Sequence, residues 1–170
     1  FHVPVTDVTR EQRATAKTVN FAVIYGQTEN ALSRNLRIPK PEAKRYIEAF
    51  FARYAGIAAF LDRVTDDARR RGFVTTLSGR RRTVADIHSQ NPNLRMAAER
   101  VARNTPIQGT AADLIKKAMI AIDRRLAAEH PGQLMLLQVH DELVFEVDEG
   151  RVDAVREMVV DEMTHAIELA

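Results

Sequence analysis

Three consecutive ionisable residues, His140, Asp141 and Glu142, interrupt the mostly apolar stretch from Gln133 to Val147. The runs on either side are rich in branched and aromatic residues, so the pattern predicts a β-hairpin whose tight turn carries the ionisable groups. Turns are normally built from Gly, Asn or Pro, and none of these is present here.

The two neighbouring carboxylates need compensation, because unit charges about 4 Å apart repel by roughly 4 kcal/mol at the effective dielectric of a protein surface. A divalent cation is one candidate, since magnesium is held by one or two carboxylates together with waters and substrate phosphates. A solvated acidic hairpin tip is the alternative, and these residues alone favour neither.

A second set of candidate residues recurs every four positions and ends at Gly26: Arg13, Lys17, Phe21 and Tyr25. Thr9 and Gln12 have the spacing of a capping box, which predicts a helix that ends at Gly26. At roughly 100° per residue, the four side chains wind slowly along one side of this helix. Two cations suit phosphates and two rings suit a sugar and a base, which indicates a nucleotide platform. The alternative is a helix at a domain edge that snorkels two long cations.

A third set has the same spacing: Arg100, Asn104 and Gln108. Arg, Asn and Gln side chains hydrogen-bond phosphates and base edges well, so this set indicates a surface that contacts a polar partner. A plain solvated helix face explains it nearly as well. Thr105-Pro106 lies inside the set and is expected to interrupt the helix.

The elements that position these residues follow from apolar periodicity and from Gly and Pro punctuation. Helices are predicted over residues 9–25, 29–36, 41–54, 57–71, 95–104, 110–128 and 151–168, and hairpins over residues 73–84 and 133–147. The fold class is therefore α+β and mostly helical. The first hairpin carries Arg80, Arg81 and Arg82, which we expect to be exposed, either for solubility or for contact with a nucleic-acid backbone.

Composition limits the class of protein. The 170 residues are 45% hydrophobic with only 7 Gly and 6 Pro, which predicts an ordered domain. There is no Cys, so disulfides and thiolate metal sites are excluded. No apolar run is long enough to span a bilayer and the N-terminus resembles no targeting peptide, so we expect a cytoplasmic protein without membrane contact. The missing initiator Met and the stop inside a helical pattern lead us to expect a fragment of a longer parent protein.

Read together, the three sets resemble family A DNA polymerases, the bacterial polymerase I type. Residues 13–26 are similar to that family's nucleotide-binding helix, residues 138–142 to its palm hairpin, and residues 99–113 to the helix pair between them. The resemblance covers essentially the whole chain in the family's order. It implies a mostly helical fingers subdomain at residues 1–90, followed at residues 91–170 by the C-terminal part of the palm with an antiparallel hairpin that carries the acidic turn.

The resemblance also implies a role for each matching residue. Arg13 and Lys17 hold the triphosphate of the incoming deoxynucleotide, and Lys17 is in addition a possible proton donor to the leaving pyrophosphate. Phe21 lies against the sugar, and Tyr25 and Gly26 close the insertion site. Arg100, Asn104 and Gln108 touch primer-template DNA, and His140 lies near the primer terminus. Asp141 binds magnesium, and Glu142 is a secondary metal and catalytic residue because neighbouring residues of a strand point to opposite faces.

The implied activity is template-directed DNA synthesis in DNA replication and DNA repair, by nucleotidyl transfer from a dNTP to a primer 3′ hydroxyl with a two-metal mechanism. One departure matters: the family's second metal-binding Asp comes from a strand before the nucleotide helix, and the thumb and N-terminal palm are absent as well. We therefore expect the fragment alone to be inactive. The rival interpretations are a nucleotide or primer-template DNA binding module without catalysis, and a different two-metal phosphotransferase or nuclease that uses the same acidic turn.

Overall fold

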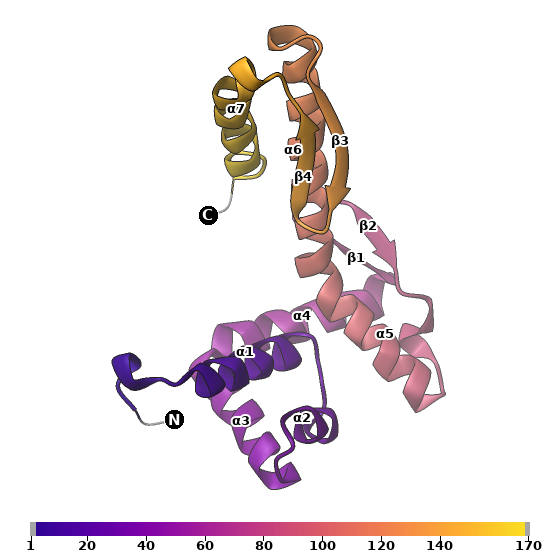
Figure 1. The fold of residues 1–170 in the computed structure, drawn as a ribbon. Helices are drawn as coiled ribbons and strands as arrows, with labels where there is room; N and C mark the ends of the chain where they lie inside the picture. The colour runs from indigo at the N-terminus through magenta and orange to yellow at the C-terminus, as the bar shows by residue number, and fades with distance from the viewer. Residues whose placement is uncertain (1–2, 169–170) are drawn as a thin grey trace. The chain divides into compact units, whose positions relative to one another are not determined.

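The computed structural model describes residues 3–168 (Figure 1), and it divides into two compact units. The N-terminal unit runs from Phe1 to Ile107 and the C-terminal unit from Gln108 to Ala170. The class is α+β with two small antiparallel sheets, which confirms the predicted fold class. The functional division into fingers and palm at residue 90 stays a prediction. No described helix is long and apolar enough to cross a membrane.

The N-terminal unit is mostly helical. Its elements in chain order are η1 (Val5–Asp7), α1 (Arg10–Ile24), α2 (Glu29–Leu36), α3 (Lys40–Arg53), α4 (Ala55–Arg71), β1 (Phe73–Thr75), β2 (Arg81–Thr83), η2 (Ala85–His88) and α5 (Pro92–Asn104). One core cluster joins α1, α2 and α3 through the buried side chains of Ala22, Leu32 and Ala43. A second cluster joins α4, the β1–β2 hairpin, η2 and α5, and is built around Ala68, Val74, Val84, Ile87, Ala98 and Ala102.

Several helix ends follow local sequence rules. The capping box at α1 is present: the Gln12 amide N–H donates to Thr9 Oγ1 at 3.2 Å, and the Thr9 N–H donates to Gln12 Oε1 at 3.0 Å. Gly72 ends α4 in the left-handed conformation with φ of 73°, which glycine adopts without the steric penalty of a Cβ. The predicted start and end of α1 are therefore confirmed, and so is the predicted end of α4.

Other boundaries differ from the prediction. α5 begins at Pro92 rather than at Arg95, because Asn91 accepts a hydrogen bond from the Asn93 N–H and Pro92 occupies the favoured first position. α4 begins at Ala55, so Gly56 lies inside it and is no boundary. α7 ends at Thr164 rather than at Glu168.

The predicted break at Thr105-Pro106 is a π-helical turn, Thr105–Gly109, that follows α5 directly. Pro106 has no N–H to donate to the carbonyl of Ala102, so the regular hydrogen-bond ladder cannot continue through it. Next to it, the carbonyl of Val101 accepts from both the Thr105 N–H and Thr105 Oγ1, the latter at 2.6 Å. The proline thus widens the helix locally rather than ending it, and π turns of this kind are frequent at functional sites.

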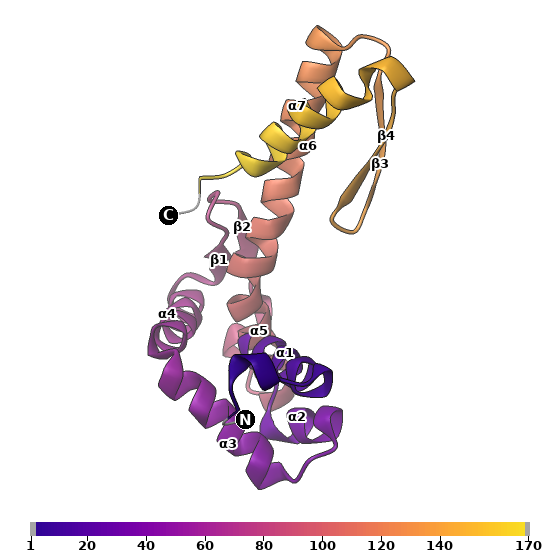
Figure 2. The same ribbon diagram turned by 60° about the vertical axis from the view of Figure 1, so that its left-hand side comes forward.

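The C-terminal unit places a hairpin and two helices around one core. It consists of α6 (Thr110–Glu129), β3 (Leu134–Val139), β4 (Glu142–Glu146), η4 (Glu149–Arg151) and α7 (Val152–Thr164). Figure 2, which turns the view by 60°, shows α7 beside α6. Ala118, Ile122 and Leu126 of α6 pack against Val155 and Met158 of α7, and Phe145 covers this cluster from the hairpin.

The open end of the β3–β4 hairpin is closed by Gln133, whose side chain is buried. Its Nε2 donates to Asp148 Oδ2 at 2.9 Å, and its Oε1 accepts from the Asp148 N–H at 2.6 Å. The strands pair antiparallel from Leu134 opposite Glu146 to Val139 opposite Glu142, with a bulge between Met135 and Leu137. This register leaves only His140 and Asp141 in the turn.

Candidate functional site

Arg13, Lys17 and Phe21 form an exposed stripe on α1, which Tyr25 continues at the C-terminal end of the helix. Its two cations are available to bind a ligand. Among residues 3–168, neither Arg13 nor Lys17 forms a salt bridge or a side-chain hydrogen bond. Lys17 Nζ lies 5.9 Å from the centre of the Phe21 ring, and the Phe21 and Tyr25 rings are stacked with centroids 6.0 Å apart and planes 25° apart. Phe21 is 49% exposed. A large exposed ring beside unpaired cations is unusual for a structural helix face and suits a ligand that carries both phosphate and a planar group.

The opposite side of α1 explains why this stripe faces outward. Ala22 and Val23 are buried, each only 3% exposed, and Ala22 packs against Leu32 of α2 and Ala43 of α3. Burial of this small apolar face against two helices leaves the cationic and aromatic side chains at the surface.

Gly26 joins the end of this stripe to α5. It has φ of 72°, and a Cβ added to it would lie 3.4 Å from Cγ of Arg100. The structure therefore brings together two sets of residues that the sequence analysis treated separately. The absence of a side chain at Gly26 makes room for the Arg100 stem beside the last turn of α1.

The α5 set has two different environments within the N-terminal unit. Arg100 is exposed, and among residues 3–168 its guanidinium has no hydrogen-bond or ion-pair partner. The Oδ1 atom of Asn104 is buried and also lacks a hydrogen-bond partner within the described chain. Unsatisfied polar atoms of this kind are candidates for ligand contact. Gln108 is exposed and belongs to the π turn at the start of the C-terminal unit.

The predicted hairpin with an ionisable turn is present, but its loop holds only His140 and Asp141, because Glu142 is the first residue of β4 and pairs with Val139. His140 adopts φ of 54°, a left-handed conformation that costs a residue with a Cβ free energy. The Gln138 Nε2 donates to the His140 carbonyl at 2.7 Å and helps to hold this conformation. Strained backbone is typical of functional sites. Asp141 and Glu142 are exposed, and neither has an ion-pair or hydrogen-bond partner among residues 3–168.

A groove of about 490 Å³ lies beside this turn within the C-terminal unit. Its lining combines Gln138, His140 and Asp141 of the hairpin with one face of α6 and Met163 of α7. Lys116 of α6 lies in the same lining and was missed by the sequence analysis. No spacing rule connects it to the acidic turn, because the two meet only through the packing of the hairpin on α6.

The hairpin offers hard anionic oxygens, which suit magnesium in chemistry. The donor set is small: within residues 3–168, no group of three His, Cys, Asp or Glu side chains is close enough to hold a metal ion. Asp141 and Glu142 therefore fit one or two positions of a magnesium shell, and further oxygens have to come from waters, a ligand or another part of the protein.

The family model "DNA polymerase family A" matches residues 1–170 of this chain. The chain therefore belongs to DNA polymerase family A, which confirms the resemblance seen in the three motifs.

Its relatives carry the name DNA polymerase I. The chain is 47% identical over 164 residues to that of Lactococcus lactis subsp. lactis strain IL1403, and 45% identical over 169 residues to that of Geobacillus stearothermophilus. These matches cover 96% and 99% of this chain but only 19% of each relative, so the chain spans about a fifth of their length.

A solved structure is similar as well. It is the POL domain of Pol1 from M. smegmatis in complex with DNA primer-template and dNTP, with 41% sequence identity and a TM-score of 0.93. The match covers 98% of this chain and 30% of that chain.

Proposed function

We propose that this chain is the nucleotide-binding and C-terminal palm part of a DNA-directed DNA polymerase, which transfers a nucleotidyl group from a dNTP to a primer 3′ hydroxyl. The single observation that carries the proposal is the α1 stripe, where Lys17 lies beside the exposed Phe21 ring and Arg13, one turn earlier, has no ion-pair or hydrogen-bond partner among residues 3–168. Membership of DNA polymerase family A supports it. The M. smegmatis relative, whose structure is a complex with DNA primer-template and dNTP, supports these two partners.

In the proposed reaction the primer 3′ oxygen attacks the α-phosphorus of the dNTP, and pyrophosphate leaves. Arg13 and Lys17 bind the triphosphate, and Lys17 supplies a proton to the leaving pyrophosphate. Phe21 packs against the sugar, and Tyr25 and Gly26 close the insertion site. Arg100, Asn104, Gln108 and His140 contact the primer-template. The assignments of Arg13 and Lys17 rest on charged side chains that form no ion pair or hydrogen bond in the described chain, so their donors are open to a phosphate.

Magnesium is the cofactor that we propose, held by Asp141 with Glu142 in a secondary position. When bound, it supplies electrostatic stabilisation of the charge that develops on the transferred phosphoryl group. The exposure of both carboxylates and the absence of an ion-pair partner in residues 3–168 support this assignment.

This chain exposes an apolar surface that another part of the parent polymerase could contact. One face of the β3–β4 hairpin exposes apolar side chains: Leu134 is 52%, Leu137 49% and Val144 39% exposed, and the register places Leu137 opposite Val144. Contiguous exposed apolar residues of this kind mark an interface. We infer that another part of the parent polymerase packs there and completes the carboxylate set.

Primer extension tests the proposal. The parent polymerase should extend a primed template with dNTPs and magnesium, and the 170-residue chain alone should not. Sustained synthesis by the chain alone would contradict the argument that its carboxylate set is incomplete.

A nucleotide or primer-template DNA binding module without catalysis is the second candidate, because the exposed Arg13, Lys17 and Arg100 side chains would also serve binding alone. Titration of a labelled primer-template and a dNTP into the parent protein, beside the extension assay, separates the two. Binding without any extension by the parent would establish the module. Strand degradation with magnesium and no dNTP would instead indicate a nuclease.

A further inference from the structure

The faces of α4 and α5 that contact each other are apolar and are lined by small side chains. Ala68 of α4 and Ala102 of α5 are fully buried, and Ala98 is 6% exposed. Alanine side chains allow two helices to pack closely, but they form low ridges that resist rotation of one helix on the other only weakly. The rotation of α5 about its axis decides where Arg100 and Asn104 point. Val84 and Ile87 of the same cluster hold α5 from the side of η2, but the buried apolar contact with α4 is made by these small alanines.

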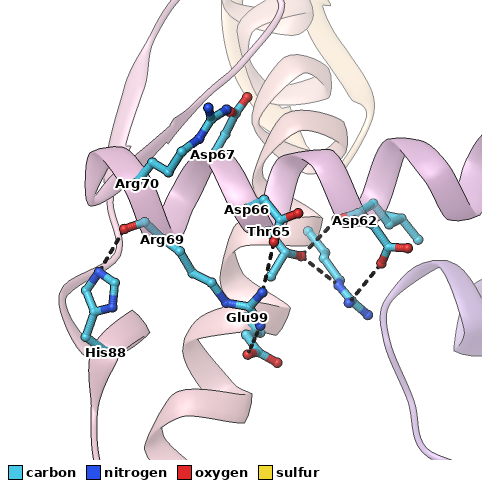
Figure 3. Close-up of polar contacts among 10 residues, drawn as sticks. Asp62, Thr65, Asp66, Asp67, Arg69, Arg70, His88 and Glu99 are labelled. Atoms are coloured by element: carbon cyan, nitrogen blue, oxygen red, sulfur yellow. Dashed lines mark hydrogen bonds and ion pairs between the residues drawn. The ribbon is translucent and has the colours of Figure 1, made fainter.

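Polar contacts on the flank of this face constrain the rotation of α5 on α4 (Figure 3). Arg69 Nη2 lies 2.8 Å from Glu99 Oε1, and one turn further along α5 Arg103 Nε donates to Thr65 Oγ1 at 3.0 Å. Arg103 Nη2 also lies 3.6 Å from Asp62 Oδ1. The two α5 residues are four positions apart and their α4 partners descend one helix in step, so the contacts form a ladder between the helices.

Thr65 is the buried residue among these polar contacts, with only 2% of its surface exposed. Its hydroxyl donates to the Leu61 carbonyl at 2.8 Å and accepts from Arg103 at 3.0 Å. The donation fixes the hydroxyl hydrogen, so a lone pair points toward Arg103. A hydrogen bond between a charged donor and a buried acceptor is stronger and more directional than one between neutral groups at the surface.

Two arginines three positions apart on α5 therefore have opposite environments. The Arg103 side chain is 30% exposed and its guanidinium contacts α4, whereas Arg100 is exposed and has no partner within residues 3–168. Arg103 is thus occupied by the protein, while Arg100 is free for a ligand.

We propose that Arg103 and Thr65 are positioning residues: their hydrogen bond fixes the rotation of α5 on α4 and so presents Arg100 and Asn104 to the primer-template. This inference rests on the proposed function, because it needs Arg100 to contact DNA. It assigns to Arg103 an indirect role, with no contact between its guanidinium and the nucleic acid.

Primer-template affinity of the parent polymerase tests the proposal, measured well below its melting temperature. Arg103→Met keeps the length of the side chain and removes the donor, and Thr65→Val keeps the shape and removes the acceptor. For each we expect the primer-template Kd to rise about threefold to tenfold, the range of a coupled pair. Thr65→Ser, which restores the hydroxyl, should bind like the parent. Arg63→Met removes an exposed α4 arginine without a partner in residues 3–168 and serves as the control.

A background that lacks Arg100 separates positioning from general stability. In Arg100→Ala, the further substitution Arg103→Met should raise Kd by less than about twofold, because the group that it positions has been removed. An equal rise in both backgrounds, or no rise in either, would overturn the proposal while leaving the polymerase assignment intact. If Arg100→Ala alone left Kd unchanged, the proposed DNA contact of Arg100 would fail, and the positioning role with it. Should Thr65→Val fail to fold, Arg103→Met and Thr65→Ser still decide the outcome.

Discussion

Gly26 and Arg100 lie side by side although they belong to different candidate sets: a Cβ on Gly26 would approach Cγ of Arg100 to 3.4 Å. The contact joins the end of the proposed nucleotide helix to the proposed DNA-contacting helix within one compact unit. A change at the proposed insertion site can therefore reach the proposed primer-template contact through the stem of the Arg100 side chain.

Gly26→Ala should combine two effects. A left-handed residue with a Cβ costs roughly 1–2 kcal/mol, so the melting temperature of the parent polymerase should fall. The added methyl also crowds the Arg100 stem, and we expect primer-template binding to weaken about threefold, or roughly 0.7 kcal/mol. Gly72→Ala is the matched control, because Gly72 has φ of 73° and nothing within 4 Å of an added Cβ. Equal loss of DNA affinity in both variants would show that the Arg100 contact is unimportant.

Asp141→Asn separates a metal ligand from a solvated tip. If Asp141 holds magnesium, the substitution should lower the nucleotide incorporation rate of the parent polymerase at least about a hundredfold, because loss of several kcal/mol of electrostatic stabilisation slows the reaction tenfold per 1.4 kcal/mol. Primer-template affinity and melting temperature should change little. Rapid-quench kinetics at saturating magnesium and dNTP measures the rate.

Glu142→Gln is the companion variant and should lower the incorporation rate noticeably less. Glu142 is the first residue of β4 and pairs with Val139, and neighbouring residues of a strand point to opposite faces. Incorporation like that of the parent by Asp141→Asn would favour the solvated tip. A larger loss at Glu142 would exchange the roles of the two carboxylates.

Lys17→Ala should impair the use of dNTP far more than the binding of DNA, because Lys17 lies over Phe21 in the α1 stripe. We expect a weaker apparent dNTP affinity or a slower chemical step, by about tenfold or more for the loss of a charge-assisted phosphate contact. Pre-steady-state incorporation at varied dNTP measures both. Lys17→Arg, which keeps the charge, should recover part of the affinity; an equal loss of primer-template binding in Lys17→Ala would assign the residue to the DNA backbone.

We expect the ion pairs of Arg125 to make the stability of the C-terminal unit depend on pH. Arg125 lies 2.8 Å from Glu129 and 3.2 Å from both Asp161 and Glu162, so it connects α6 with α7. The hydrogen bond from Arg125 lowers the pKa of the Glu129 carboxyl below its ordinary value. A lowered pKa means that this contribution is fully present above the ordinary glutamate pKa of about 4.3 and is lost as the pH falls through the lower, folded-state value.

The loss of melting temperature caused by Arg125→Met should therefore be larger at about pH 6 than at about pH 3, where the acidic partners become protonated in both proteins. Arg156→Met is the control, since its single exposed contact to Asp153 is of a kind that contributes little. A loss at Arg125 that does not change with pH would mean that its hydrophobic stem, not its charge, stabilises the helix pair.

The sequence by itself determined the features that depend on near neighbours along the chain. The capping box of Thr9 and Gln12, the glycine end at Gly72 and the hairpin with an ionisable turn all form from groups within a few residues of one another, so their spacing is enough to predict them. The four-residue spacing of Arg13 to Tyr25 likewise predicts one exposed helix stripe. The family resemblance came from the same local motifs, and the family match confirms it.

Only the tertiary structure decided which distant groups meet. Gly26 beside Arg100, Thr65 beneath Arg103, and Lys116 in the groove of His140 and Asp141 each join elements far apart in the chain. No periodicity encodes such pairs, because they depend on how closely the alanine faces of α4 and α5 approach and on how the hairpin packs on α6. The π turn at Pro106 shows the same limit: the missing N–H forbids a regular helix, but packing chooses between a break and a widened turn.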